Sequence, residues 1–319
     1  MKALFVTSNR VGDAILSSGI LNRIIEDNPG IAVTVACGPV AVSLFEACPQ
    51  VAAVIAMPKA RYGLHWFRLW RRCVGTYWDI VVDLRGSALS WLLPRRRAFV
   101  LRPSGDPVHR VEMLARVIRA ADVPEPRVWT GERQEGEAAK LLPERPILAL
   151  GPTANWGGKQ WPADRFLDVA RRLTKDDGPL PGAKIAVFGA AGERPMAAPL
   201  FDGLPRDGVV DLIGRTDLPT AAACLKRCAL FVGNDSGLMH LAAASGIPTL
   251  GLFGPSPERH YAPWGRCTAF VRTPESFEEI VGAPDYDYRS QESRMTSLTV
   301  DRVYEAALGL LEKRDRMQS

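Results

Sequence analysis

The 319-residue chain has little of what marks a membrane-spanning, secreted or metal-binding protein. No uninterrupted apolar segment approaches the roughly 20 residues that span a bilayer, so any membrane contact should be peripheral. The apolar run near the N-terminus, Ala3 to Val6, is too short for a signal peptide and is interpreted as a first strand. The six cysteines form no zinc or disulfide pattern, and Cys224 and Cys228 have no neighbouring ligand cluster. We therefore expect a reduced, cytoplasmic location.

What the chain does have is an ordinary globular composition, with 47% hydrophobic and 24% charged residues. Its length exceeds what one hydrophobic core usually serves, which predicts two domains. The net charge of +5 and the pI near 9.0 are mildly basic. They favour an anionic ligand or an anionic surface as partner.

Short apolar runs alternate with helical stretches twice along the chain, which predicts two parallel sheets in an α/β fold. The two series of runs are Ala3–Val6, Val33–Ala36, Val51–Ala56, Ile80–Leu84 and Phe99–Leu101, then Ile147–Leu150, Ile185–Phe188, Val209–Ile213, Leu230–Val232, Thr249–Phe253 and Ala269–Val271. A Pro- and Glu-rich passage, 123–145, should link them. We predict two Rossmann-like, doubly wound domains, 1–140 and 145–299, that face a central cleft. A last helix within 300–319 can cross back onto the first domain.

The most informative segment is the polar turn Asp235-Ser236-Gly237, which lies between a buried strand and a helix of small residues. The first turn of such a helix presents unpaired N–H groups and the positive end of its dipole, which suits a phosphate. Gly237 lets the backbone approach a ligand closely, and the alanines at 242–244 let the helix pack tightly on its sheet. We therefore predict a phosphate site at this junction.

Three other loops follow predicted strands and carry polar groups. Asp13 lies near the start of a helix after the first strand, where it is either a catalytic acid or base or a residue that caps the helix. The glycine-rich segment 151–162 contains Lys159 and is either a diphosphate cradle or a surface loop with Trp161 in the core. Glu193 follows the next strand, at a position from which acids bind ribose diols in dinucleotide sites.

Together these pieces resemble the ADP-heptose:lipopolysaccharide heptosyltransferases of glycosyltransferase family 9, which have the GT-B fold. The resemblance rests on Gly12-Asp13, Asp83-Leu84-Arg85-Gly86, Lys159-x-Trp161-Pro162, Asp235-Ser236-Gly237-x-Met239-His240 and Phe253-Gly254-Pro255. It implies an inverting transferase that moves heptose from ADP-heptose to the lipid A-Kdo inner core of lipopolysaccharide.

The same resemblance implies roles for single residues. Asp13 would be the catalytic base, and the donor would be bound by Thr153, Asn155, Lys159, Glu193, Asp235, Ser236, Gly237 and His240. Within that set, Lys159 and Thr153 would hold the diphosphate, Glu193 the ribose and Asp235 the sugar hydroxyls. Neither a cofactor nor a metal is expected, because a helix terminus and Lys159 can meet the leaving-group charge. The one Asp-x-Asp spacing, Asp285 and Asp287, lies in a late Pro- and Tyr-rich loop and is interpreted as solvated.

Aromatic and basic residues interleave in 65–72, and three arginines follow an apolar run at 95–97. We expect these segments to bind the anionic acceptor and an anionic inner-membrane surface, through Arg61, Arg68, Arg71, Arg72 and Arg95. The alternative is a solvated basic helix face with Trp66 and Trp70 packed inward. Nucleic acid uses similar residues, but the sugar-nucleotide motifs argue against it as a partner.

Other functions stay open at this point. Nucleotide-sugar 2-epimerases share the two-domain architecture but require neither an acceptor nor a basic N-terminal patch. A family 9 transferase with another sugar or acceptor is equally compatible with the motifs. A Rossmann oxidoreductase is disfavoured because no Gly-x-Gly-x-x-Gly follows the first strand. The presence of both Asp13 and Lys159 argues against a non-catalytic binder.

Overall fold

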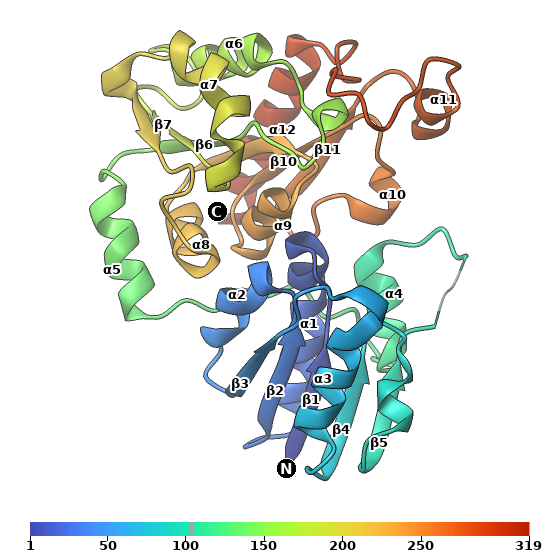
Figure 1. The fold of residues 1–319 in the computed structure, drawn as a ribbon. Helices are drawn as coiled ribbons and strands as arrows, with labels where there is room; N and C mark the ends of the chain where they lie inside the picture. The colour runs from blue at the N-terminus through green and yellow to red at the C-terminus, as the bar shows by residue number, and fades with distance from the viewer. Residues whose placement is uncertain (103–104, 319) are drawn as a thin grey trace. The chain divides into compact units, whose positions relative to one another are not determined.

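The computed structural model describes residues 1–102 and 105–318, and these form two compact units, Met1–Gly131 and Glu132–Ser319 (Figure 1). Each unit is an α/β sandwich around its own sheet, and every strand pairing in both sheets is parallel. The division falls within the passage that we expected to be a linker. Part of that passage is helix α5 (Glu132–Leu141), which packs on α8 (Leu218–Lys226) and so belongs to the second unit.

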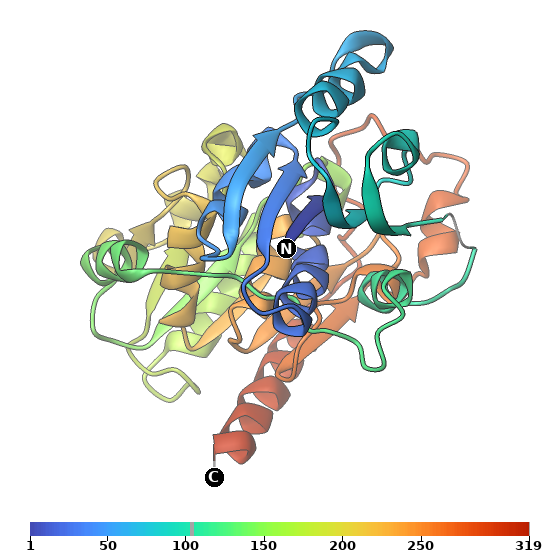
Figure 2. The same ribbon diagram turned by 90° about the horizontal axis from the view of Figure 1, so that it is seen from below.

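The first unit has a five-stranded sheet in the order β3-β2-β1-β4-β5. Its strands are β1 (Lys2–Val6), β2 (Ala32–Cys37), β3 (Val51–Ala56), β4 (Trp78–Asp83) and β5 (Arg95–Val100). Its helices are α1 (Val11–Asp27), α2 (Val42–Glu46), α3 (Leu64–Cys73) and α4 (Arg110–Val117), with 3-10 turns η1 (Pro39–Ala41), η2 (Arg61–Gly63) and η3 (Ala88–Trp91). Figure 2 shows α1 and α4 on one face of this sheet and α3 and η3 on the other. Parallel strands that are covered on both faces consist largely of apolar residues. Most strands of this sheet could therefore be predicted from the sequence.

The second unit has a six-stranded sheet in the order β11-β10-β9-β6-β7-β8. Its strands are β6 (Ile147–Gly151), β7 (Lys184–Val187), β8 (Val209–Asp211), β9 (Leu230–Asn234), β10 (Thr249–Phe253) and β11 (Thr268–Arg272). Besides α5 and α8, its helices are α6 (Ala163–Thr174), α7 (Arg194–Gly203), α9 (Gly237–Ala244), α10 (Glu258–Tyr261), α11 (Phe277–Val281) and α12 (Val300–Gln318), with 3-10 turns η4 (Gly157–Lys159), η5 (Ala191–Glu193) and η6 (Arg206–Gly208). The C-terminal helix α12 packs on α6, β10 and β11, all of this same unit.

In each sheet the strand order reverses beside the first strand of the unit. The reversal lies between the neighbouring strands β1 and β4 in the first sheet and between β6 and β9 in the second. Ligands of open α/β sheets bind beyond the carboxyl ends of the strands at such a reversal. The loops that follow β1, β4, β6 and β9 are therefore the places where each unit is built to bind something.

The core of the second unit explains how α9 comes so close to its sheet. Gly151, Gly233 and Gly251 lie side by side on β6, β9 and β10. A Cβ at Gly251 would lie 2.5 Å from Met239 of α9, and one at Gly233 would lie 2.6 Å from the ring of Phe231. Because these glycines have no side chains, Met239 and Phe231 fit against the sheet, and α9 packs closely on it.

One sequence expectation needs correction in the fold. Strand β5 begins at Arg95, not at Phe99, because it is the edge strand and carries charged residues where a central strand would be apolar. Within 1–102 and 105–318, no helix is long and apolar enough to cross a membrane.

Trp161 connects the core of the second unit to the loop after β6. Its side chain is 1% exposed, its ring meets Phe166 edge-on, and its Nε1 donates to the Leu298 carbonyl at 2.9 Å. Arg165 donates to the same carbonyl. The carbonyl therefore keeps a partner when the indole is removed.

We expect Trp161→Ala to lower the free energy of unfolding by about 3 to 5 kcal/mol, because it empties a large buried volume. Trp161→Phe keeps an aromatic ring and leaves Leu298 bonded to Arg165, so its loss should stay below about 2 kcal/mol. Urea unfolding of both variants measures this. Equal losses would show that the indole hydrogen bond, not packing, holds the residue in place.

Candidate functional site

Two of the predicted donor residues of the second unit meet at the reversal between β6 and β9. Lys159, in the loop after β6, donates to Asp235, which follows β9, and the distance from Nζ to Oδ2 is 2.6 Å. The Asp235 side chain is 7% exposed and that of Lys159 is 23% exposed. Two loops far apart in sequence are thus joined by one short, mostly buried ion pair.

The helix that begins after Asp235 has a terminus open to a ligand. Ser236 is the N-cap of α9, in an extended conformation, and its side chain makes no capping hydrogen bond. The Ser236 Oγ is buried and has no hydrogen-bond partner among the described residues. Gly237 is the first residue of α9, and His240 lies in the helix 5% exposed. A buried hydroxyl without a partner beside unpaired N–H groups is an arrangement that an anionic ligand would complete.

Asn234, which the sequence did not single out, closes the loop that carries Lys159. Its Nδ2 donates to the Pro152 carbonyl at 2.8 Å, and its Oδ1 accepts from the Trp161 amide at 3.0 Å. Both ends of the loop are therefore fixed to the residue that precedes Asp235. Asn234 is fully buried, so both bonds are shielded from water.

A late segment, 290–294, holds the same loop from outside. The Trp156 indole donates to the Ser290 carbonyl at 2.7 Å, and the Gly157 amide donates to Gln291 at 3.1 Å. A Cβ at Gly157 would lie 2.1 Å from the Gln291 carbonyl oxygen, so only glycine allows this approach. The loop is a clamped structure, not a free surface loop.

Thr153 and Glu193 meet at the carboxyl ends of β6 and β7. The Thr153 hydroxyl donates to Glu193 Oε2 at 2.7 Å, and the Ala190 amide donates to the same oxygen at 2.9 Å. Thr153 is buried, whereas Glu193 is partly exposed and Asn155 is exposed. The structure thus brings Thr153 and Glu193 together, as it does Lys159 and Asp235.

In the first unit, Asp13 lies in the first turn of α1, after β1. Its Oδ1 is 3.7 Å from Arg110 Nε and its Oδ2 accepts from the Ser8 hydroxyl at 3.4 Å. The N-cap of α1 is Arg10, so Asp13 is not the cap. Its side chain is 17% exposed and therefore still reaches solvent. Arg110, at the start of α4, is a partner that no spacing in the sequence connects with Asp13.

Asp83 shapes the neighbouring turn after β4. It is fully buried and accepts hydrogen bonds from the Arg85 amide, the Ser87 amide and the Ser87 hydroxyl. Burial raises the pKa of its carboxyl, and these hydrogen bonds oppose that rise. The turn presents Arg85, whose guanidinium donates to Asn9 at 3.0 Å and lies over the Trp66 ring. Asp83 is therefore a structural acid that positions Arg85 beside the loop of Asp13.

The predicted acceptor residues do not form one single group. Arg68, Arg71 and Arg72 of α3 line a cavity of about 370 Å³ together with His65, and Arg61 is exposed on η2. Trp66 and Trp70 pack against the core that includes Leu69 and Cys73, as the alternative interpretation of this helix had it. Arg95 begins β5 opposite Trp78, at the amino edge of the sheet, whereas Asp13 follows the carboxyl edge.

The remaining candidates for metal or redox chemistry are accounted for by other contacts. Asp285 accepts from Arg294 at 2.5 Å, and this hydrogen bond lowers the pKa of the Asp285 carboxyl. Burial raises the pKa of Cys224 to about 12, and the Cys228 thiol donates to the Cys224 carbonyl. In the described part of the chain, no group of three or more His, Cys, Asp or Glu is placed to hold a metal ion.

A comparison with protein-family models then identifies the chain. The model of glycosyltransferase family 9 (heptosyltransferase) matches residues 108–281, more than half of its length. This chain belongs to glycosyltransferase family 9. The matched residues of the family 9 chain lie mostly in the second unit and include the loop of Lys159 and the helix after Asp235.

Individual relatives agree with this assignment. The lipooligosaccharide heptosyltransferase 2 of Haemophilus influenzae is 32% identical over 167 residues, which cover 48% of the family 9 chain and 47% of that protein. This match spans about half the length of the relative. The lipooligosaccharide heptosyltransferase 2 of Haemophilus ducreyi is 24% identical over 316 residues, which cover 85% of this chain and 88% of that one.

Among solved structures, the ADP-heptose lipopolysaccharide heptosyltransferase II of Escherichia coli superposes with a TM-score of 0.75. The sequence identity is 22%, and the match covers 99% of the family 9 chain and 100% of that chain. This likeness, with the two all-parallel sheets, confirms the predicted fold class, a GT-B protein of two Rossmann-like units.

The buried position of Asn234 generates a testable expectation. Asn234→Ala leaves the Pro152 carbonyl and the Trp161 amide without partners in a dry site, so the free energy of unfolding should fall by about 2 to 4 kcal/mol. Asn22→Ala is the matched control, because that amide also makes two side-chain bonds, to Glu26 and Arg127, but in a partly exposed position. Chemical denaturation that ranks the two variants equally would mean that Asn234 does not fasten the loop.

Proposed function

We propose that this family 9 chain is an inverting glycosyltransferase that moves heptose from ADP-heptose to the lipid A-Kdo inner core of lipopolysaccharide. The observation that carries the proposal is the Lys159–Asp235 ion pair beside the open N-terminus of α9. An ammonium group and a helix terminus that converge at a sheet reversal form a site for a diphosphate.

The donor roles follow from the positions of the side chains in the second unit. Ser236, Gly237 and Lys159 bind the diphosphate, and Thr153 adds a hydroxyl at the end of β6. Glu193 and Asn155 bind the ribose. Thr153 and the Ala190 amide both donate to Glu193 Oε2, so Oε1 is the oxygen that a diol would meet. Asp235 accepts from the sugar hydroxyls, and His240 of α9 also contacts the donor.

Leaving-group stabilisation in this scheme comes from fixed charges of the protein. As the bond between sugar and diphosphate breaks, negative charge grows on the diphosphate. The helix dipole and the Lys159 ammonium are already oriented toward that position, which lowers the barrier without reorganisation. No metal is needed for this step, and no cofactor takes part.

Asp13 is the base in this proposal. Its carboxylate accepts the proton of the acceptor hydroxyl while that oxygen attacks the anomeric carbon from the face opposite the diphosphate, which inverts the configuration. Ser8 and Arg110 hold the carboxylate in one orientation. Arg85, held by Asp83, is positioned to contact the acceptor near the reacting hydroxyl.

The first unit also binds the rest of the acceptor. Arg61, Arg68, Arg71 and Arg72 meet its anionic sugars and phosphates, since guanidinium groups bind phosphate and carboxylate in bidentate fashion. Arg95, at the other edge of the sheet, meets the lipid end of the acceptor at the membrane. The protein therefore acts in the cytoplasm, in peripheral contact with the inner membrane.

Product analysis tests the function directly. The full chain is incubated with ADP-heptose, with and without a Kdo-bearing lipid A, and in parallel with UDP-GlcNAc alone. ADP release and a heptosylated lipid that form only when donor and acceptor are both present support the transferase. Epimerised UDP-sugar without an acceptor would establish the isomerase instead.

Lys159→Ala should weaken ADP-heptose binding by about 1.5 to 3 kcal/mol, because it removes a charge-assisted contact to the diphosphate. Calorimetry measures the affinity. Lys226→Ala is the control, since Lys226 also pairs with an acid of the second unit, Glu135, but away from the β6–β9 reversal. Unchanged donor affinity in Lys159→Ala would remove this lysine from the site.

Asp13→Asn should lower kcat by roughly 10² to 10⁴ and leave donor affinity nearly intact, because the amide keeps the shape of the side chain and cannot accept the proton. Asp27→Asn, at the other end of α1, is the matched control. Steady-state kinetics and calorimetry separate the two effects. Near-normal turnover in a folded Asp13→Asn protein would assign the base to another residue.

Turnover should also persist in EDTA, because a helix terminus and a lysine replace the cation in this mechanism. The assay is ADP release before and after chelation. Loss of activity that Mg²⁺ or Mn²⁺ restores would contradict the metal-free mechanism.

A further inference from the structure

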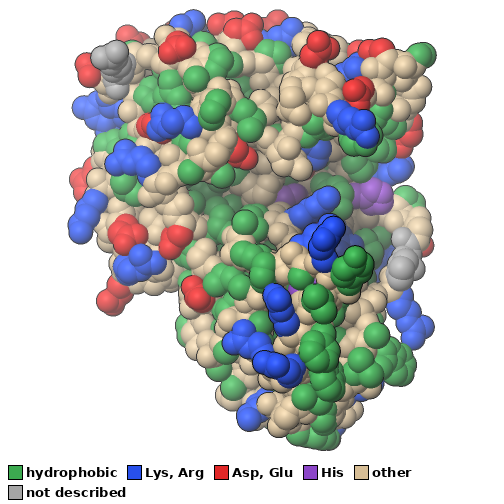
Figure 3. All heavy atoms as spheres, viewed as in Figure 1, with side chains coloured by type: hydrophobic (Ala, Val, Ile, Leu, Met, Phe, Trp, Pro, Cys, Tyr) green, Lys and Arg blue, Asp and Glu red, His purple; other side chains and the backbone are tan. Residues whose placement is uncertain are grey.

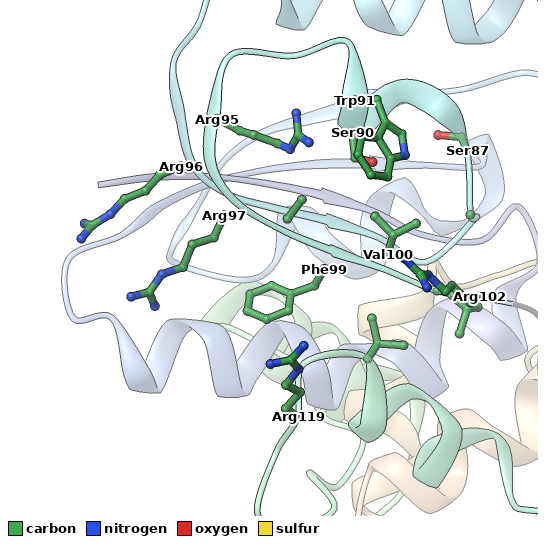
Figure 4. Close-up of a pocket in the computed structure, with 14 residues that line it drawn as sticks. Ser87, Ser90, Trp91, Arg95, Arg96, Arg97, Phe99, Val100, Arg102 and Arg119 are labelled. Carbon is green, nitrogen blue, oxygen red and sulfur yellow. The ribbon is translucent and has the colours of Figure 1, made fainter.

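A groove runs along the edge strand β5, and of the arginines assigned to the acceptor only Arg95 lines it. Its volume is about 1030 Å³, and it is lined by residues of η3, β5 and the end of α4. Five of these residues are arginines, Arg95, Arg96, Arg97, Arg102 and Arg119, and none is acidic. Figure 4 shows Arg95, Arg96 and Arg97 fanning out from the start of β5, with Trp91 and Ser90 on one side and Arg119 on the other.

Four arginines of this groove have no acidic partner among the described residues. In the described part of the chain, Arg95, Arg96, Arg97 and Arg119 form no ion pair, whereas Arg23, Arg133 and Arg272 each pair with an acid. Residues 51–100 contain nine Lys or Arg and only two Asp or Glu. Arg95 donates to the Leu93 carbonyl at 3.3 Å. Guanidinium groups without an acidic partner are available to anions from outside the protein.

Two further observations indicate a ligand with both phosphate and apolar parts. The Ser90 Oγ, on a fully buried residue that lines the groove, has no hydrogen-bond partner among the described residues. Trp91 and Leu92, at the end of η3, are 70% and 61% exposed, and the Arg95 guanidinium lies 5.6 Å from the centre of the Trp91 ring. Exposed indole beside arginine is typical of groups that enter the interfacial layer of a bilayer.

The apolar surface continues onto α3. The Trp70 indole donates to the Leu92 carbonyl at 3.2 Å, and the exposed Phe67 stacks on Trp70. Figure 3 shows basic and hydrophobic side chains next to each other on the face of the first unit that carries α3. One surface thus combines apolar groups with cationic ones, which complements an anionic lipid layer.

We propose that the β5 groove is a phospholipid site, in which its arginines bind the phosphates of anionic lipids while Trp91 and Leu92 enter the interfacial layer. The site begins at the amino edge of the sheet, about 20 Å, the length of a six-residue strand, from the carboxyl edge that Asp13 follows. The proposal rests on the membrane contact proposed above, but it does not depend on the donor or on the transfer step.

Co-sedimentation of the full chain with lipid vesicles tests the site. One set of vesicles consists of phosphatidylcholine alone, and the other is prepared with about 30% phosphatidylglycerol. The groove variant is the triple Arg95→Gln, Arg96→Gln, Arg97→Gln. Its control, the triple Arg171→Gln, Lys175→Gln, Arg259→Gln, removes the same charge from exposed positions of the second unit. Trp91→Ala is paired with Tyr288→Ala, since Tyr288 is another exposed aromatic ring beside an arginine.

Wild type should bind only the anionic vesicles, and the groove triple should lower the partition coefficient by roughly 100-fold, about fivefold for each arginine. Trp91→Ala should lower it several-fold, and both controls by less than about twofold. Equal losses in the two charge-removal triples would reduce the effect to net charge and overturn the site. Unchanged vesicle binding by the groove triple would also overturn the site. This holds even if the triple binds a deacylated acceptor more weakly.

The same variants separate this proposal from the proposed function. Calorimetry with ADP-heptose should give wild-type affinity for all of them, because the groove lies in the first unit and the donor residues lie in the second. Heptose transfer to a deacylated acceptor without any vesicle binding would overturn the lipid site and leave the transferase in place. Vesicle binding without heptose transfer would support the lipid site and contradict the proposed transferase function.

Discussion

The ion pair between Lys159 and Asp235 is the interaction on which the rest of the candidate donor site depends. It forms only because β6 and β9 are neighbours in the sheet, which brings together loops that are 76 residues apart. Around the ion pair lie buried polar groups that need hydrogen-bond partners, such as Asn234. Nearby glycines leave space for the close approach of α9 and of the 290–294 segment. A mostly buried lysine and aspartate neutralise each other while no ligand is bound, so the site tolerates the empty state without an unpaired charge.

Much of the fold follows from the sequence because parallel strands covered on both faces are short apolar runs. Strands β3 and β10 have the predicted ends, and the other strands except β5 differ from the predicted ends by a residue or two. The prediction was wrong at β5, whose first residues are arginines, because an edge strand is not required to be apolar. Helix α5 lies in a Glu-rich passage, and its packing on α8 leaves only a narrow buried side for a pattern to reveal.

The candidate site was predictable as far as loops after strands are concerned. Since the carboxyl ends of parallel strands share one edge, the loops of Lys159 and Asp235 were expected to lie there, and the structure joins these two residues by an ion pair. The fastening residues were not predictable. Asn234 was not singled out from the sequence, and its two bonds run to residues that only the fold brings near. Arg110 reaches Asp13 across 97 positions of the chain and no motif contains both.

A double-mutant cycle on ADP affinity tests the central claim, that Lys159 and Asp235 act on the diphosphate as one unit. ADP lacks the sugar, so only the contacts to the nucleotide are measured. In the wild-type background, Asp235→Asn should weaken ADP binding because Lys159 loses the group that orients it. In the Lys159→Met background, the same change should strengthen binding, because it removes a carboxylate that repels the phosphates. A coupling of at least about 1 kcal/mol with this change of sign is the predicted result. The same effect of Asp235→Asn in both backgrounds would contradict it.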